Sequence, residues 1–128
     1  MSNTIAEFMT PCPHSVGAEQ PLLKAMEFMR THHVRHLPVL HGGELVGMLS
    51  DRDVVLLENL ADMLREEIDV EQAMSTEPYT VERDAPLASV LKEMAARHLG
   101  SAVVVDNNKV VGIFTSSDAV RMLADRIG

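Results

Sequence analysis

The chain repeats itself with a spacing of 65 residues, and this repeat limits the folds available to it. Shifting the sequence by 65 positions, without a gap, aligns one ordered run of identical residues. The aligned pairs include Met9/Met74, Val16/Val81, Pro21/Pro86, Met29/Met94, Gly47/Gly112 and Asp53/Asp118. Identities at one fixed offset, with matching apolar positions, indicate two copies of one structural unit. We therefore expect domains at residues 1–65 and 66–128.

Each copy carries the same order of local patterns. A proline at the expected first helical position opens a helix with an apolar stripe. The stripes are Leu22, Met26 and Met29 in one copy and Leu87, Leu91 and Met94 in the other. A branched strand pattern follows ("HLPVL" or "SAVVV"), then a hairpin turn rich in Gly or Asn, a second strand and a second helix. The predicted class is α+β or α/β, built from two β-α-β-β-α units.

A unit of this size cannot bury a sheet face alone. We expect the two copies to pack sheet to sheet about a pseudo-two-fold axis. This arrangement leaves two equivalent clefts between the copies, and such junctions commonly hold small ligands.

Composition excludes several classes of function. The chain has 128 residues and a net charge of −8, which disfavours duplex nucleic acid as a partner. With 3% aromatic residues and no Trp, a stacking platform for single strands is not expected either. No apolar run is long enough to span a bilayer, and the first residues lack the pattern of a signal peptide. The single cysteine, Cys12, fits a reducing cytoplasm.

The junction between the last strand and the last helix of each copy carries a hydroxyl and a carboxylate three residues apart. These residues are Ser50 and Asp53 in the first copy and Thr115 and Asp118 in the second. One interpretation is a capping box, in which the two side chains bond to each other's backbone N–H groups. The other is a ligand site, because a helix N-terminus favours an anion and a carboxylate accepts hydrogen bonds from hydroxyls.

The two copies together resemble a tandem pair of CBS domains, often called a Bateman module. The resemblance is carried by "MTPCPHSV…PLLKAMEFM…VRHLPVL…LVGMLSDRD" and "MSTEPYTV…PLASVLKEM…LGSAVVV…VVGIFTSSD". It implies the β-α-β-β-α unit and binding of an adenosyl ligand: AMP, ADP or ATP, or else NAD or S-adenosylmethionine. It further implies a non-catalytic regulatory module that needs no cofactor, forms a homodimer and acts on an effector protein.

The resemblance also assigns roles to residues. Asp118 and Asp53 accept hydrogen bonds from ribose hydroxyls, and Thr115 and Ser50 contact ribose or phosphate. Arg35 and His36 are expected to reach the phosphate of the ligand held by the other copy, at Thr115 and Asp118. Their counterparts Gly100 and Ser101 carry no charge, so we expect the Asp118 site to bind better than the Asp53 site. The base is expected to contact Thr80, Val81, Ala102 and Ile113, although ordinary core packing explains Val81 and Ile113 better.

Other functions are weaker interpretations of the same residues. His32, His33 and His36 lack a clear Cys or carboxylate partner, so we expect no metal site. No catalytic motif is present, so we expect no enzyme. A redox role for Cys12 is possible but secondary. The main alternative is a structural module that dimerises and docks on a partner, with degenerate ligand sites. Apolar residues beyond the needs of one small core favour a dimer: Leu56, Leu57, Leu60, Met63, Leu64, Met122 and Leu123.

Overall fold

The computed structural model describes residues 3–11, 14–54 and 68–128. The chain divides into two compact units, residues 14–78 and residues 1–13 with 79–128, and each is described here by itself. Cys12 lies outside the described residues, as do Leu56, Leu57, Leu60, Met63 and Leu64. The redox role of Cys12 and that part of the dimer prediction therefore stay predictions. Within the described residues, no helix is long and apolar enough to cross a membrane.

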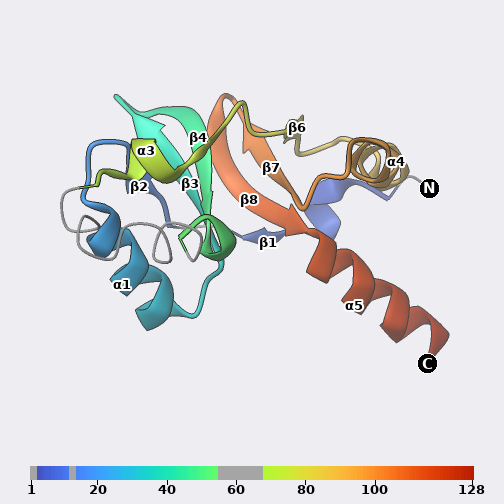
Figure 1. The fold of residues 1–128 in the computed structure, drawn as a ribbon. Coiled ribbons are helices and arrows are strands. Elements are labelled where there is room, and N and C mark those ends of the chain that lie inside the picture. Colours follow the sequence, from blue (N-terminus) through green and yellow to red (C-terminus); the bar gives the residue numbers. More distant parts are fainter. Residues whose placement is uncertain (1–2, 12–13, 55–67) are drawn as a thin grey trace. The chain divides into compact units, whose positions relative to one another are not determined.

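The unit of residues 14–78 contains a four-stranded sheet in the order β2-β3-β4-β5, of which Figure 1 labels β2, β3 and β4. Its strands are β2 (Val16–Gly17), β3 (His36–His41), β4 (Glu44–Ser50) and β5 (Ser75–Thr76). Its helices are α1 (Leu22–His32) and α3 (Val70–Ala73), and residues 51–54 are helical. β2 pairs with β3 in parallel, and the other two pairings are antiparallel.

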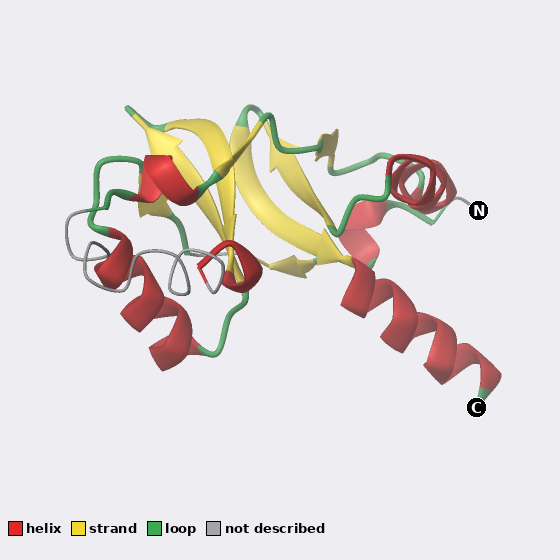
Figure 2. Cartoon of the chain, in the orientation of Figure 1, coloured by secondary structure: helices red, strands yellow, loops and turns green. Residues whose placement is uncertain are grey.

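The other unit contains a sheet in the order β1-β8-β7-β6. Its strands are β1 (Thr10–Pro11), β6 (Thr80–Glu82), β7 (Ser101–Asp106) and β8 (Lys109–Thr115). Its helices are η1 (Ile5–Glu7), α4 (Leu87–Arg97) and α5 (Ser116–Ile127). β8 runs directly into α5, as Figure 2 shows. The pairings repeat those of the first unit, with β6 and β7 parallel and the others antiparallel. The predicted mixed fold of two repeated units is confirmed.

The two hairpin turns have the backbone that their residues predict. Gly42 and Gly43 have φ values of 59° and 84°, and Asn107 and Asn108 have 52° and 65°. Two consecutive residues with positive φ match the right-handed twist of the flanking strands. The turns therefore set the β3–β4 and β7–β8 hairpins in register.

The start of each first helix differs by one residue from the prediction. Pro21 and Pro86 are N-cap residues with extended ψ values of 138° and 131°, and the helices begin at Leu22 and Leu87. Proline supplies no N–H at either position, so the sequence pattern does not separate the two. The C-cap residue of each helix is a histidine in the left-handed region: His33 follows α1 and His98 follows α4, each with φ of 55°.

The core of each unit lies between the helices and one face of the sheet. Leu22, Met26 and Met29 are buried, which confirms the first predicted stripe. In α4, Leu87 and Met94 are buried, but Val90 is the third fully buried residue and Leu91 only packs against the core from its edge. From the sheets, the cores receive Leu37, Val39 and Leu49 in one unit and Ala102, Val104 and Phe114 in the other.

The segment before each copy's first strand packs with the body of the other copy. Ile5 is fully buried in the core that holds Phe114, and its N–H donates to the Ala85 carbonyl over 2.8 Å. In the equivalent contact, Val70 donates to the Gln20 carbonyl over 2.9 Å. Residues 1–13 of the first copy thus pack in one compact unit with residues 79–128 of the second copy. The equivalent segment of the second copy, which ends at residue 78, packs in the other unit. The division of the copies at residue 65 stays a prediction about the repeat.

Candidate functional site

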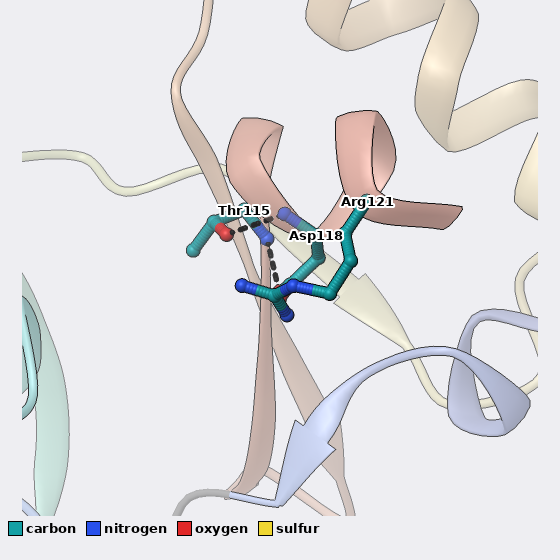
Figure 3. Close-up of polar contacts among 3 residues, drawn as sticks. All are labelled: Thr115, Asp118 and Arg121. Carbon is teal, nitrogen blue, oxygen red and sulfur yellow. Dashed lines mark hydrogen bonds and ion pairs between the residues drawn. The ribbon is translucent and has the colours of Figure 1, made fainter. Parts of the chain in front are cut away.

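The Thr115–Asp118 junction forms a complete capping box. The Thr115 N–H donates to Asp118 Oδ2 over 2.9 Å, and the Asp118 N–H donates to Thr115 Oγ1 over 3.1 Å (Figure 3). Thr115 has extended backbone angles while α5 begins at the next residue, which is the usual geometry of an N-cap. The capping interpretation of these two residues is therefore confirmed.

The Asp118 carboxylate keeps acceptor capacity beyond the cap. Its side chain is 14% exposed, and its Oδ1 atom lies 3.4 Å from Nη1 of the exposed Arg121. A carboxylate has about four lone-pair sites, and the contacts with Thr115 and Arg121 occupy two of them. The cap and a contact with the hydroxyls of a ligand are chemically compatible.

The first copy repeats this box at the end of β4. The Ser50 N–H donates to Asp53 Oδ2 and the Asp53 N–H donates to Ser50 Oγ, both over 3.2 Å. The neighbouring residues differ: Asp51 occupies the position that Ser116 has in the other copy. The Asp51 N–H donates to the Arg35 carbonyl over 3.0 Å, as the Ser116 N–H donates to the Gly100 carbonyl over 2.9 Å. The backbone is therefore the same around both boxes, but the charge is not.

The structure brings Arg35 and His36 beside the box of their own copy. His36 is the register partner of Ser50 across β3 and β4, and the exposed Arg35 precedes it. The equivalent partner of Thr115 is Ser101. The expected reach of Arg35 and His36 to the Thr115–Asp118 site stays a prediction.

The residues proposed for the base lie on two faces of one sheet. Thr80, Val103 and Ile113 are register partners across β6, β7 and β8, so their side chains share one face. Val81 and Ala102 lie on the opposite face, where Ala102 is fully buried in the core and Val81 packs against it. The geometry groups Thr80 with Ile113 and gives Val81 and Ala102 a packing role.

Two surface hollows, each within a single unit, are lined by no residue of either box. One is lined by Glu7, Glu82, Asp84 and Asp106 around Arg83, which pairs with Asp106 over 3.4 Å. Its excess of carboxylates makes it unsuited to a phosphate. The other lies along α1 and is lined by Lys24, Phe28 and His32 among others.

Three equivalent positions form a cluster of side chains in each copy, but the residue types differ between the copies. The sequence motifs did not predict either cluster. The His32 ring centroid lies 4.2 Å from that of Phe28 and 4.7 Å from that of His14. At the same three repeat positions, the other copy has Arg97, Glu93 and Tyr79. The Arg97 guanidinium lies 5.4 Å from the centre of the Tyr79 ring and pairs with Glu93 over 3.2 Å. The 65-residue offset was the signal available to find both clusters.

The Tyr79 hydroxyl is the group of this cluster with a perturbed acidity. Burial raises the pKa of Tyr79 above its ordinary value of 10.0, and the Glu93 carboxylate raises it further, while Arg97 acts in the opposite direction. In the described part of the chain, no three His, Cys, Asp or Glu side chains gather as metal ligands would. His32 instead stacks on rings, and His33 ends α1.

Comparison with known proteins identifies the repeated unit. The family model of the CBS domain matches residues 5–59 and again residues 68–125. The CBS domain-containing protein YhcV of Bacillus subtilis is 30% identical over 116 residues, which cover 91% of this chain and 82% of that protein.

Solved structures show the same arrangement of elements. The structure of CBSX2 in complex with AMP is 27% identical and has a TM-score of 0.78, covering 98% of both chains. The CBS domain pair of protein MJ0100, in complex with 5′-methylthioadenosine and S-adenosyl-L-methionine, is 25% identical with a TM-score of 0.80. That match covers 94% of this chain and 99% of the other. With two matched segments that together span most of its length, the chain belongs to the CBS domain family.

Proposed function

We propose that this protein is a non-catalytic regulatory module that binds an adenosyl ligand of the AMP, ADP or ATP class. The observation that carries the proposal is the repeated box, Ser50 with Asp53 and Thr115 with Asp118, at a strand-to-helix junction in both copies. Relatives solved with AMP, 5′-methylthioadenosine and S-adenosyl-L-methionine support the adenosyl class. NAD is a further candidate of this class.

The chemistry of the Asp118 box suits a nucleotide. The carboxylate accepts hydrogen bonds from the 2′- and 3′-hydroxyls of the ribose on the lone pairs that the cap leaves open. The positive end of the α5 dipole favours the phosphate nearby. Thr80 and Ile113, which share a sheet face, contact the base, and Arg35 and His36 add positive charge, as the family resemblance implies.

The two boxes are proposed to bind unequally. Asp51 adds a negative charge beside Ser50, where the other copy has the neutral Ser116 beside Thr115. A like charge next to a phosphate site weakens binding, although Arg52 offsets part of it. The Asp118 site therefore takes the more highly charged ligand, and the Asp53 site binds weakly or prefers a less charged one.

Regulation requires that the ligand distinguish two states of the protein. A ligand with equal affinity for both states shifts neither, so nucleotide binding must change the geometry that an effector protein recognises. We place this module in the cytoplasm, as a homodimer.

The test is a binding panel on wild type and two substitutions of Asp118. AMP, ADP, ATP, NAD and S-adenosylmethionine are titrated by calorimetry, with melting curves recorded in parallel. A ligand present at about 100 times its Kd stabilises the fold by about 2.7 kcal/mol. Asp118→Asn keeps a carbonyl acceptor for the Thr115 N–H but loses the charge, so it separates ligand binding from capping. We expect Asp118→Asn and Asp118→Ala to weaken binding about tenfold or more.

The matched control is Asp125→Ala, an exposed carboxylate on the same helix. It should leave the affinity unchanged. If no adenosyl compound binds wild type, or if all three variants bind as wild type does, the Asp118 box is a helix cap only.

A structural module that dimerises and docks on a partner is the second candidate, and α5 favours it. Val120, Leu123 and Ile127 recur on one side of this helix and are 67%, 57% and 77% exposed. Met122, by contrast, packs against the core. Leu123→Glu is expected to convert a dimer to a monomer in sedimentation runs if this stripe is an interface. A dimer that ignores every nucleotide would favour this second function.

A further inference from the structure

Two methionine side chains rest on two strand glycines at equivalent places in the two units. A Cβ built on Gly47 would lie 2.5 Å from Met74 Sδ and 2.8 Å from the Ser75 carbonyl oxygen. A Cβ on Gly112 would lie 2.9 Å from Met9 Cγ and closer still to the sulfur of Met9. Real Cβ atoms do not approach this closely, so each thioether fills the space that a side chain would take. We call these the Met9–Gly112 and Met74–Gly47 contacts.

Each contact holds a short strand at the edge of its sheet. β1 follows Met9 and pairs with β8, where Pro11 is the register partner of Gly112. β5 follows Met74 and pairs with β4, where Thr76 is the register partner of Gly47. Both strands have only two residues, so the sheet ladder alone supplies few hydrogen bonds to them. Packing of the methionine side chains against the glycines therefore adds to the few ladder contacts that hold these strands.

The two strands stand where the chain passes from one unit to the other. The units meet in sequence between residues 13 and 14 and again between residues 78 and 79. β1 ends at Pro11 and β5 at Thr76, each shortly before such a passage. Loss of the Met9–Gly112 contact would free β1 from its sheet as far back as η1, and loss of the Met74–Gly47 contact would free β5 as far back as α3.

Exposure separates these two methionines from most of the others. Met26, Met29, Met48 and Met94 are buried, between 5% and 7% exposed. Met9 and Met74 are partly exposed and pack against the edges of the two cores. As whole residues, Met9 and Met74 are more accessible than the buried four, so we expect a small hydroperoxide to oxidise them first. Met122, on α5, is the other partly exposed methionine in the described part of the chain.

We propose that the Met9–Gly112 and Met74–Gly47 contacts form a paired redox-sensitive device that releases β1 and β5 from the edges of their sheets when the two thioethers are oxidised. The oxidant is a hydroperoxide. Its O–O bond breaks, one oxygen forms the S–O bond of the sulfoxide, and the other leaves as water or an alcohol. The sulfur loses two electrons and the peroxide gains them. The sulfoxide is polar and larger, so it no longer fits against the glycine and the apolar core edge.

The experiment exposes the folded chain to hydrogen peroxide and compares wild type with Met9→Leu, Met74→Leu and the double variant. Leucine conserves volume, fills the same space and does not form a sulfoxide. Peptide mass mapping gives the order of oxidation, and amide hydrogen exchange follows Thr10 in β1 and residues 75–76 in β5, with their partners on β8 and β4. No ligand is needed, so the outcome is independent of nucleotide binding.

In wild type we expect Met9 and Met74 to gain oxygen before the four buried methionines. Oxidation should speed amide exchange in β1 and β5 and lower the melting temperature by roughly 2–8 °C. Each single variant should protect only its own unit, the double variant should protect both, and methionine sulfoxide reductases should restore wild type. Met122→Leu, the matched control, should respond to peroxide as wild type does.

Three results would overturn the proposal. One is oxidation of Met9 and Met74 with no change in exchange at β1 and β5. The second is oxidation of the buried methionines first, which would indicate global opening as the route of attack. The third is equal sensitivity of the double variant and wild type to peroxide.

Discussion

His36 and Ser50 are register partners across β3 and β4, so an imidazole and a capping hydroxyl share one sheet face. In the other copy the same pair of positions holds Ser101 and Thr115. The two boxes therefore have the same backbone and different neighbours, and His36 is the residue whose substitution tells the boxes apart.

His36→Ser is expected to weaken binding of ATP at the Asp118 site about tenfold, because it removes a charge-assisted contact to phosphate. The titration is repeated in the Asp53→Ala and Asp118→Ala backgrounds. The effect should persist with Asp53→Ala and vanish with Asp118→Ala. The reverse result would mean that His36 serves the Ser50–Asp53 box beside it and would contradict the family-based assignment.

Loss of a capping carboxylate should destabilise the fold without any ligand. Asp118→Ala removes the acceptor for the Thr115 N–H, so we expect the free energy of unfolding to fall by roughly 0.5–2 kcal/mol. Asp53→Ala should cost less, because its two hydrogen bonds are longer, at 3.2 Å. Urea unfolding gives the free energy of unfolding of both variants. The control is Asp125→Ala, which should stay within about 0.5 kcal/mol of wild type. An Asp118→Ala variant as stable as this control would mean that the capping box does not stabilise the fold.

The sequence predicted the parts of the fold that depend on periodicity and turn chemistry. Helical spacing located α1 and α4, and Gly-Gly and Asn-Asn located the two hairpins, because positive φ at two consecutive positions leaves few alternatives. The same repeat located both boxes, where the hydroxyl and carboxylate stand three residues apart. These features depend on residues that are close in the sequence. Each can therefore be recognised in one copy and checked against the equivalent residues of the other.

Contacts between distant segments were not predictable in this way. β1 and β5 are two residues long, and so short a strand has no period to detect. Gly47 and Gly112 were visible as a repeated pair, but only the structure shows Met74 and Met9 against them. Of the base-binding candidates, Thr80 and Ile113 share a face while Ala102 belongs to the core. β7 is apolar at four consecutive positions, so its pattern does not tell which residues face the core.

The acidity of Tyr79 links its surroundings to the pH dependence of stability. Burial, assisted by Glu93, raises the pKa of Tyr79 in the folded protein, so the unfolded chain loses this proton first as the pH rises. The stabilising contribution is complete below about pH 10, the unfolded value, and is lost as the pH rises through the folded value. Tyr79→Phe should therefore make the fall of stability above about pH 10 less steep.

The titration of Tyr79 can be followed directly, because it is the only tyrosine in the chain. Ultraviolet absorbance of the phenolate in folded and urea-unfolded protein gives the two pKa values. Arg97→Gln should raise the folded pKa further, since it removes the one cation that lowers it. A folded pKa at or below the unfolded one would contradict the assigned causes.

Alanine at either strand glycine should test the packing of the two methionines against the sheet. Gly47→Ala places a methyl group 2.8 Å from the backbone oxygen of Ser75, which cannot rotate away. We expect both Gly47→Ala and Gly112→Ala to lower the free energy of unfolding by roughly 1–3 kcal/mol, the usual effect of overpacking. Gly100→Ala is the control, because a Cβ there meets nothing within 4 Å.

A second substitution distinguishes the clash of the new methyl group with the Met9 side chain from its clash with the backbone. Met9→Ala combined with Gly112→Ala should recover part of the lost stability, because the added methyl group takes the space that the thioether leaves. Recovery should be incomplete, since the Thr10 carbonyl oxygen still lies 3.0 Å from the new Cβ. A double-mutant cycle from urea unfolding gives the coupling. Strict additivity of the two substitutions would mean that Met9 and Gly112 do not share this space.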